Sequence, residues 1–179
     1  MPVTLRPATA ADVPAIAALH ARSWRENYTE AMSAKYLTEE APTERLAEWT
    51  RRFAGDTDRM RVSVAEVAGE LVGFCCILLD HHETDGSLLD NLHVRADHQG
   101  SGLGKRLMRA AAQQVVRDSG SDRMYLWVLA TNTRALAVYQ RLGGRVGRTE
   151  THLMPGTEPP GTTAISVHYS ARELAGPDS

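Results

Sequence analysis

A glycine-rich segment in the middle of the chain has the composition of an anion-binding turn. It follows alternating apolar residues that end at Val94, and it opens directly into apolar residues at helical spacing. Glycines let the backbone bend and approach a ligand closely, and the N–H groups at a helix start favour phosphate. We therefore expect a ligand that carries a pyrophosphate. The residues expected to hold it are Gln99, Gly100, Ser101, Gly102, Leu103, Gly104 and Lys105.

Two common phosphate-binding motifs do not fit this segment. A Walker loop requires G-x-x-x-x-G-K-[ST], whereas Gly100 and Gly104 have the wrong spacing and Arg106 stands where the hydroxyl should be. A dinucleotide fingerprint requires G-x-G-x-x-G directly after the first strand, but here the spacing is G-x-G-x-G and the position is mid-chain. Neither a Walker nucleotide site nor a dinucleotide site is indicated.

A third pattern fits the chain. Val94, a four-residue turn and the sequence QGSGLG resemble the [QR]-x-x-G-x-[GA] acyl-coenzyme A signature of the GNAT acyltransferase superfamily. Downstream, an apolar strand is followed by residues 132–143, which resemble the second signature of that superfamily, N-x-x-A…Y-x-x-x-G. The resemblance covers residues 3–169.

The resemblance implies direct attack of a primary amine on the thioester of acetyl-CoA in a ternary complex. An ammonium must lose a proton, an oxyanion must be stabilised and the departing thiolate must be protonated. By motif position Tyr139 is the general acid, although its spacing also suits a core aromatic. A backbone N–H near Val94 is the implied oxyanion donor, beside a strand bulge. The main chain of Leu92, His93 and Val94 is expected to pair with pantetheine.

Two further residues of the second signature are expected at the coenzyme. Asn132 is expected to bond pantetheine or the acceptor, with Thr131 capping the helix in its place. The alternative is that Asn132 itself is the cap. Ala135, one turn into the same helix, is expected to lie against the coenzyme.

The general base departs from the resembled pattern. Many relatives carry Glu six residues before the valine, where this chain has Leu88. We expect Asp90, on the face of Val94, to replace it or to act through water, and the alternative is a salt-bridged strand residue. His93 points to the other face and suits a packing or surface role, although an imidazole pKa of about 6.5 would also suit a base.

The acceptor site is expected between the first two helices and the loop 155–161. Trp24 and Tyr28, four residues apart, could form its floor, although core packing explains them equally well. Gly144 is a second departure, because relatives usually carry Phe there.

Hydrophobic periodicity predicts the order β-α-α-β-β-β-α-β-α-β-β. This is an α/β (α+β) architecture, sharpened by the resemblance to the GNAT fold, with a mixed, mostly antiparallel sheet of about seven strands and helices on both faces. Residues 1–173 form one expected domain, and 174–179 form an expected disordered tail. A two-residue hairpin is expected at Gly69-Glu70.

The composition of the chain argues against nucleic acid and membrane as partners. A net charge of −2 gives no pull toward nucleic acid, and no apolar run is long enough to span a membrane. Cys75 and Cys76 are adjacent, so they are expected to point to opposite faces of a strand as reduced core thiols of a cytoplasmic protein. The run 81–85 contains two histidines but lacks the spacing of a metal site, and no metal is expected.

The sequence thus predicts an N-acetyltransferase that uses acetyl-CoA as co-substrate and a small-molecule amine, rather than a protein N-terminus, as acceptor. The resemblance makes a homodimer possible. Two alternatives stay open: a non-catalytic acyl-CoA-binding sensor, which Leu88 favours, and, more remotely, a nucleotide-binding protein.

Overall fold

The computed structural model describes residues 2–153, 156 and 161–176. One seven-stranded sheet runs through it in the order β1-β2-β3-β4-β5-β7-β6. The strands are β1 (Val3–Pro7), β2 (Met60–Val67), β3 (Glu70–His82), β4 (Gly86–Val94), β5 (Arg123–Leu129), β6 (Arg145–His152) and β7 (Thr162–Ser170). All neighbouring pairs are antiparallel except β4 with β5, which is parallel. The expected mixed, mostly antiparallel sheet is therefore confirmed.

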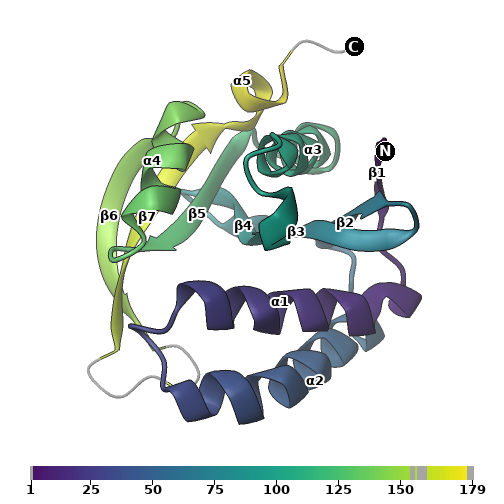
Figure 1. Cartoon of the computed structure of the whole chain (residues 1–179). Helices are drawn as coiled ribbons and strands as arrows, with labels where there is room; N and C mark the ends of the chain where they lie inside the picture. Colours follow the sequence, from purple (N-terminus) through teal and green to yellow (C-terminus); the bar gives the residue numbers. More distant parts are fainter. Residues whose placement is uncertain (1, 154–155, 157–160, 177–179) are drawn as a thin grey trace.

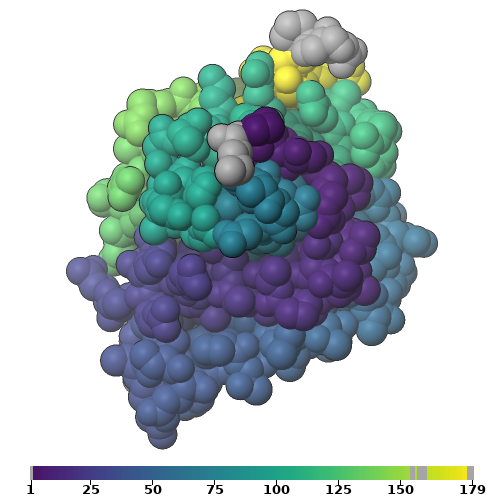
Figure 2. Space-filling model, turned by 45° about the vertical axis from the view of Figure 1, so that its right-hand side comes forward, coloured from purple at the N-terminus to yellow at the C-terminus, as the bar shows by residue number. Residues whose placement is uncertain are grey.

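Helices cover both faces of the sheet (Figure 1). The α-helices are α1 (Val13–Asn27), α2 (Ala41–Ala54), α3 (Leu103–Asp118), α4 (Thr133–Arg141) and α5 (Ala171–Ala175). Helices α1 and α2 form one layer, while α3, α4 and α5 lie on the opposite side of the sheet. In the space-filling view the purple α1 and the blue α2 form the lower part of the molecule, beneath the teal and green segments (Figure 2). None of the helices in the described part of the chain is long and apolar enough to cross a membrane.

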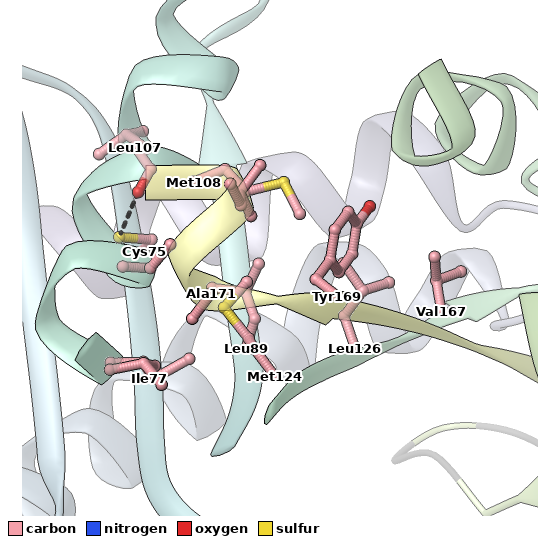
Figure 3. Packing of buried hydrophobic residues seen from close by; sticks show 14 of the residues in the cluster. Cys75, Ile77, Leu89, Leu107, Met108, Met124, Leu126, Val167, Tyr169 and Ala171 are labelled. Carbon is pink, nitrogen blue, oxygen red and sulfur yellow. Dashed lines mark hydrogen bonds between the residues drawn. The ribbon is translucent and has the colours of Figure 1, made fainter. Parts of the chain in front are cut away.

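The two adjacent cysteines mark the two cores. Cys75 belongs to the cluster beneath α3 and lies 3.4 Å from the carbonyl oxygen of Leu107 (Figure 3). Cys76 belongs to the cluster beneath α1 and α2. Successive residues of a strand point to opposite faces, so the expected placement of the two side chains is confirmed. Burial raises the pKa of both thiols, that of Cys75 to about 12.

Strands β4 and β5 pair over a very short distance. Only Ser87 with Met124 and Leu88 with Tyr125 are in register, and beyond these positions the two strands no longer pair. The remaining part of β4, up to Val94, therefore has one edge without a strand partner. An opening of this kind exposes backbone groups of the sheet to a ligand.

The structure corrects two expectations for the chain path. The first hairpin turns at Ala68 and Gly69, whose φ values are +53° and +81°, so the turn lies one residue earlier than expected. A π-helical segment, Tyr36–Glu40, for which no prediction was made, precedes α2. Residues 174 and 175 are not a disordered tail, because they complete α5 and Leu174 is buried against the core. Residues 177–179 lie outside the described part.

Candidate active site

The glycine-rich segment forms an open backbone turn in front of α3. Gly100 and Gly102 have φ values of +77° and +82°, a conformation that glycine adopts without steric strain. A Cβ atom built on either residue would have no neighbour within 4 Å. The turn therefore presents its backbone to open space.

The N–H groups of this turn have no protein acceptors. From Gly100 to Lys105, no backbone N–H has a hydrogen bond to another described residue, and the first helical bond runs from the N–H of Arg106 to the carbonyl of Gly102. The Ser101 hydroxyl closes the turn by donating to the His98 carbonyl at 2.6 Å. Unpaired N–H groups at the start of a 16-residue helix form an anion site. This geometry fits the expected pyrophosphate ligand.

The two basic side chains beside the turn have different surroundings. Arg106 donates to the carbonyl of Val3 at 3.2 Å, so its guanidinium is directed toward β1. Lys105 is exposed and forms no ion pair within the described residues. Only Lys105 is thus placed to add positive charge at the turn.

Backbone groups of β4 point into the opening beside β5. The N–H of Arg95 donates to the carbonyl of Val72 at 2.9 Å, which fixes the phase of the β3–β4 ladder. Because antiparallel bonding alternates, Val94 opposite Gly73 and Leu92 opposite Cys75 are positions without ladder bonds. Their N–H and C=O groups face away from β3, and the Val94 carbonyl accepts from the Gln99 side chain at 3.1 Å.

Tyr139 lies on α4, on the same side of the sheet as the glycine turn. Its side chain packs against the cluster beneath α3, and burial raises the pKa of its phenol to about 12, with a smaller contribution from Tyr28. Tyr28 belongs to the chain just after α1, on the other side of the sheet.

Comparison with known proteins identifies the family. Residues 16–144 match the model of the acetyltransferase (GNAT) family. The chain belongs to this family. The match includes most of α1, the whole of β4, the glycine turn and α4.

Individual relatives agree with this assignment. A probable spermine N(1)-acetyltransferase of Bacillus subtilis subsp. natto is 34% identical over 80 residues, which are 42% of this chain and 53% of that protein. The chain spans about half the length of the first curated relatives it matches. A putative acetyltransferase from Salmonella typhimurium, solved with acetyl-CoA, has a TM-score of 0.67 at 22% identity, covering 100% of this chain and 99% of that one. The PaiA N-acetyltransferase of Thermoplasma acidophilum, in complex with coenzyme A, has a TM-score of 0.72 at 14% identity, covering 94% of this chain and 100% of that one. The last two show the fold.

Asn132 caps α4 in this GNAT chain. Its Oδ1 accepts from the N–H of Ala135 at 3.1 Å, so the expectation that Thr131 would take the cap is wrong. The N–H of Ala135 is thereby satisfied within the helix. The capping role leaves the Nδ2 of Asn132 as the group available to a ligand.

Asp90 is placed differently from the expectation. The β3–β4 register shifts between Asn91 and Leu89, so Asp90 occupies a bulge and leaves the face of Val94. Its carboxylate accepts from Arg52 of α2 and from the Asn91 amide, both at 2.6 Å. The bulge thus lies at Asp90 rather than beside Val94, and the carboxylate is held by an ion pair.

Arg52 is a residue of the site that was not predicted from the sequence, and it is the partner of Asp90. Arg52 also donates to Glu48 at 2.8 Å, four residues earlier on α2. The Glu48–Arg52 spacing was a visible signal of a helix-face pair. The long-range contact to β4 had no signal in the sequence.

His93 is half-buried and takes the packing role on the α1 side of β4. Its Nδ1 lies 2.8 Å from the Ser23 hydroxyl of α1, and its ring centroid lies 4.6 Å from that of His20. Burial lowers the pKa of His93 to about 4 and lowers that of His20 as well. Both rings are therefore neutral at physiological pH.

Trp24 and Tyr28, which were expected to form the floor of the acceptor site, lie in different environments. Trp24 is buried, with the Arg45 guanidinium 4.5 Å from its ring centroid, so it serves the packing of α1 against α2. Tyr28 is partly exposed and packs against the Trp24 cluster, with 6.2 Å between the two ring centroids. Of the two, Tyr28 is therefore the one with surface to offer a ligand.

A cavity of about 660 Å³ lies next to the end of β5. Its walls come from the segment after α1, the turn before α4 and the start of β7; they are Glu30, Ala31, Met32, Ser33, Ala130, Thr131, Gly156, Gly161, Thr162 and Thr163. The expected acceptor loop 155–161 contributes Gly156 and Gly161, and its other residues lie outside the described part. The cavity has the size of a small-molecule site.

Proposed function

We propose that this protein transfers an acetyl group from acetyl-CoA to the primary amine of a small molecule. The observation that carries the proposal is the opening between β4 and β5, where the unpaired N–H groups of Leu92 and Val94 meet the glycine turn. The extended pantetheine arm of acetyl-CoA would lie in the opening like an added strand, and the pyrophosphate of the coenzyme would bind at the N-terminus of α3.

The reaction is a direct transfer. The acceptor nitrogen attacks the thioester carbon, and the backbone N–H of Val94 stabilises the negative oxygen. Collapse of the intermediate breaks the C–S bond, and the Tyr139 phenol gives its proton to the departing thiolate. The raised pKa of Tyr139 keeps that proton in place until the thiolate forms.

A small acceptor is supported by the shape of the site. The cavity of about 660 Å³ suits a ligand of drug-like size, and Glu30 supplies a carboxylate at its wall. The similarity to a protein named as a spermine acetyltransferase agrees with a small amine as acceptor. Together these observations favour a small amine over a protein N-terminus.

The first experiment is calorimetric titration of the protein with acetyl-CoA, with ATP and NAD as controls. We expect micromolar binding, about −8 kcal/mol, for acetyl-CoA alone. A panel of mono-, di- and polyamines is then screened for release of the coenzyme thiol. Binding without turnover on any amine would favour the acyl-CoA sensor, and tight binding of ATP or NAD instead would refute the proposal.

A further inference from the structure

The chemistry of the opening needs a proton acceptor on the side from which the amine arrives. The glycine turn and Tyr139 lie on the α3 and α4 side of the sheet, while the cavity wall formed by residues 30–33 continues from α1. An amine that enters through this cavity would approach the thioester from the α1 side. The base must stand on that face of β4.

Neither Leu88, where relatives carry Glu, nor the acidic residue Asp90 supplies a free base on β4. Leu88 is apolar and buried. The Asp90 carboxylate is engaged by Arg52, and Arg52 is itself packed over the Trp49 ring at 5.1 Å. Proton uptake by Asp90 would leave the half-buried Arg52 guanidinium with Glu48 as its one carboxylate partner.

His93 satisfies the positional requirement. It stands between Leu92 and Val94, and its side chain leaves β4 on the α1 side, where it meets Ser23. Nε2 has no hydrogen-bond partner in the described part of the chain, yet it is not among the polar atoms sealed in the core without one. The ring thus has one nitrogen anchored on α1 and the other accessible.

The surrounding aromatic residues fix the orientation of this ring. Trp49 Nε1 donates to His20 Nδ1 at 3.0 Å, and the His20 ring packs against His93. Phe74 of β3 packs on His93 as well, with 5.2 Å between centroids. When the Nδ1–H of His93 donates to Ser23, the Nε2 lone pair is left facing the accessible side.

We propose that His93 is the general base of this active site, a role that rests on the acetyl transfer proposed above. As the nitrogen of the neutral amine bonds to the thioester carbon, its proton passes to Nε2 of His93, which becomes an imidazolium. The C–S electrons leave with sulfur, which takes the Tyr139 proton. Solvent then carries the imidazolium proton back to the tyrosinate, so the products are the amide and the coenzyme thiol.

The test compares His93→Gln with the matched variant His82→Gln, an exposed histidine at the tip of the β3–β4 hairpin. Acetyl-CoA affinity, kcat and KM for the best amine are measured for wild type and both variants. We expect kcat of His93→Gln to fall about 100-fold or more, while acetyl-CoA affinity stays within about threefold. The His82→Gln variant should match wild type.

A second variant separates chemistry from packing. In His93→Ala, added imidazole should restore part of the lost turnover, because it can enter the vacated space and accept the proton. A structural role would not give such rescue. Thermal unfolding shows whether His93→Gln is folded. If it is not folded, the imidazole rescue of His93→Ala decides whether His93 is the base.

The outcomes are distinct. Folded His93→Gln with full turnover, or a larger loss in Asp90→Asn than in His93→Gln, would overturn the proposal and leave acetyl transfer intact. No wild-type turnover on any amine would overturn both proposals together. A loss in His93→Gln with imidazole rescue in His93→Ala supports the base role.

Discussion

The phenol of Tyr169 occupies the space beside Gly144. A Cβ atom at Gly144 would lie 2.6 Å from the Tyr169 hydroxyl oxygen and 2.4 Å from a methyl carbon of Val167. The same hydroxyl donates to the carbonyl of Tyr139 at 2.8 Å. The aromatic anchor that the resemblance places at residue 144 is thus supplied by β7, and it holds the end of α4.

Replacement of Gly144 should therefore overpack this contact. We expect Gly144→Ala to lower the free energy of unfolding by about 1–3 kcal/mol, because Tyr169 is buried and its ring cannot move aside cheaply. Gly120→Ala is the control, since a Cβ there meets no atom within 4 Å and its φ is not positive. Urea unfolding of both variants gives the comparison. Equal stability would show that the α4 end adjusts freely.

The glycine turn gives a test of coenzyme binding. The Gly102→Ala variant places a methyl group in the open space of the anion site, so we expect acetyl-CoA affinity to fall about tenfold or more. Gly69→Ala is a matched control, because its φ of +81° carries the same backbone strain in a distant hairpin. Calorimetry should show weakened binding in Gly102→Ala alone. Comparable losses in both would assign the effect to strain.

Removal of the Tyr139 hydroxyl should separate chemistry from binding. We expect kcat of Tyr139→Phe to fall about 100-fold, since the thiolate loses its proton donor, with acetyl-CoA affinity nearly unchanged. Tyr125→Phe, which loses only the 2.9 Å contact with His81, is the control. Thiol-release kinetics measure both. Full turnover in Tyr139→Phe would reduce Tyr139 to a core aromatic.

Local sequence patterns predicted most of the fold and the coenzyme-binding part of the site. The glycine turn, the α4 signature and the strand alternation of Cys75 and Cys76 are written in contiguous residues, so they could be predicted. The bulge at Asp90 has no such signal, because it depends on how β4 registers with β3. For this reason Asp90 was predicted on the wrong face of β4, and the contact of His93 with Ser23 of α1 was not predicted.

The Asp90–Arg52 pair is expected to act on stability more than on turnover. Both side chains are about one quarter exposed, so solvent screens their attraction only in part. We expect Asp90→Asn to lower the free energy of unfolding by about 1–2 kcal/mol, between the values for surface and buried pairs. Asp97→Asn, in the exposed pair with Arg95, should change stability much less. Unfolding curves measure this, and a neutral Asp90→Asn would remove the structural role.

The adjacent rings of His20 and His93 should make the fold sensitive to mild acid. The pKa of His93 is about 4 in the folded chain and near 6.5 when unfolded. The pKa of His20 is also lowered, first by burial and then by His93, Arg45 and Arg52. Below pH 6.5 the unfolded chain therefore binds more protons than the native one, and stability falls as pH drops toward 4.

His93 alone would contribute a loss of up to about 3 kcal/mol across this window. The Asp12 carboxylate affects stability only at lower pH. Its hydrogen bond with Arg6 lowers its pKa to about 2, so the stabilisation from this pair is lost only as the pH falls below 3.8. Urea midpoints measured from pH 7 to pH 4.5 should decline in wild type and His82→Gln, and less in His93→Gln. A flat wild-type profile would mean that the rings bind protons as readily when folded as when unfolded.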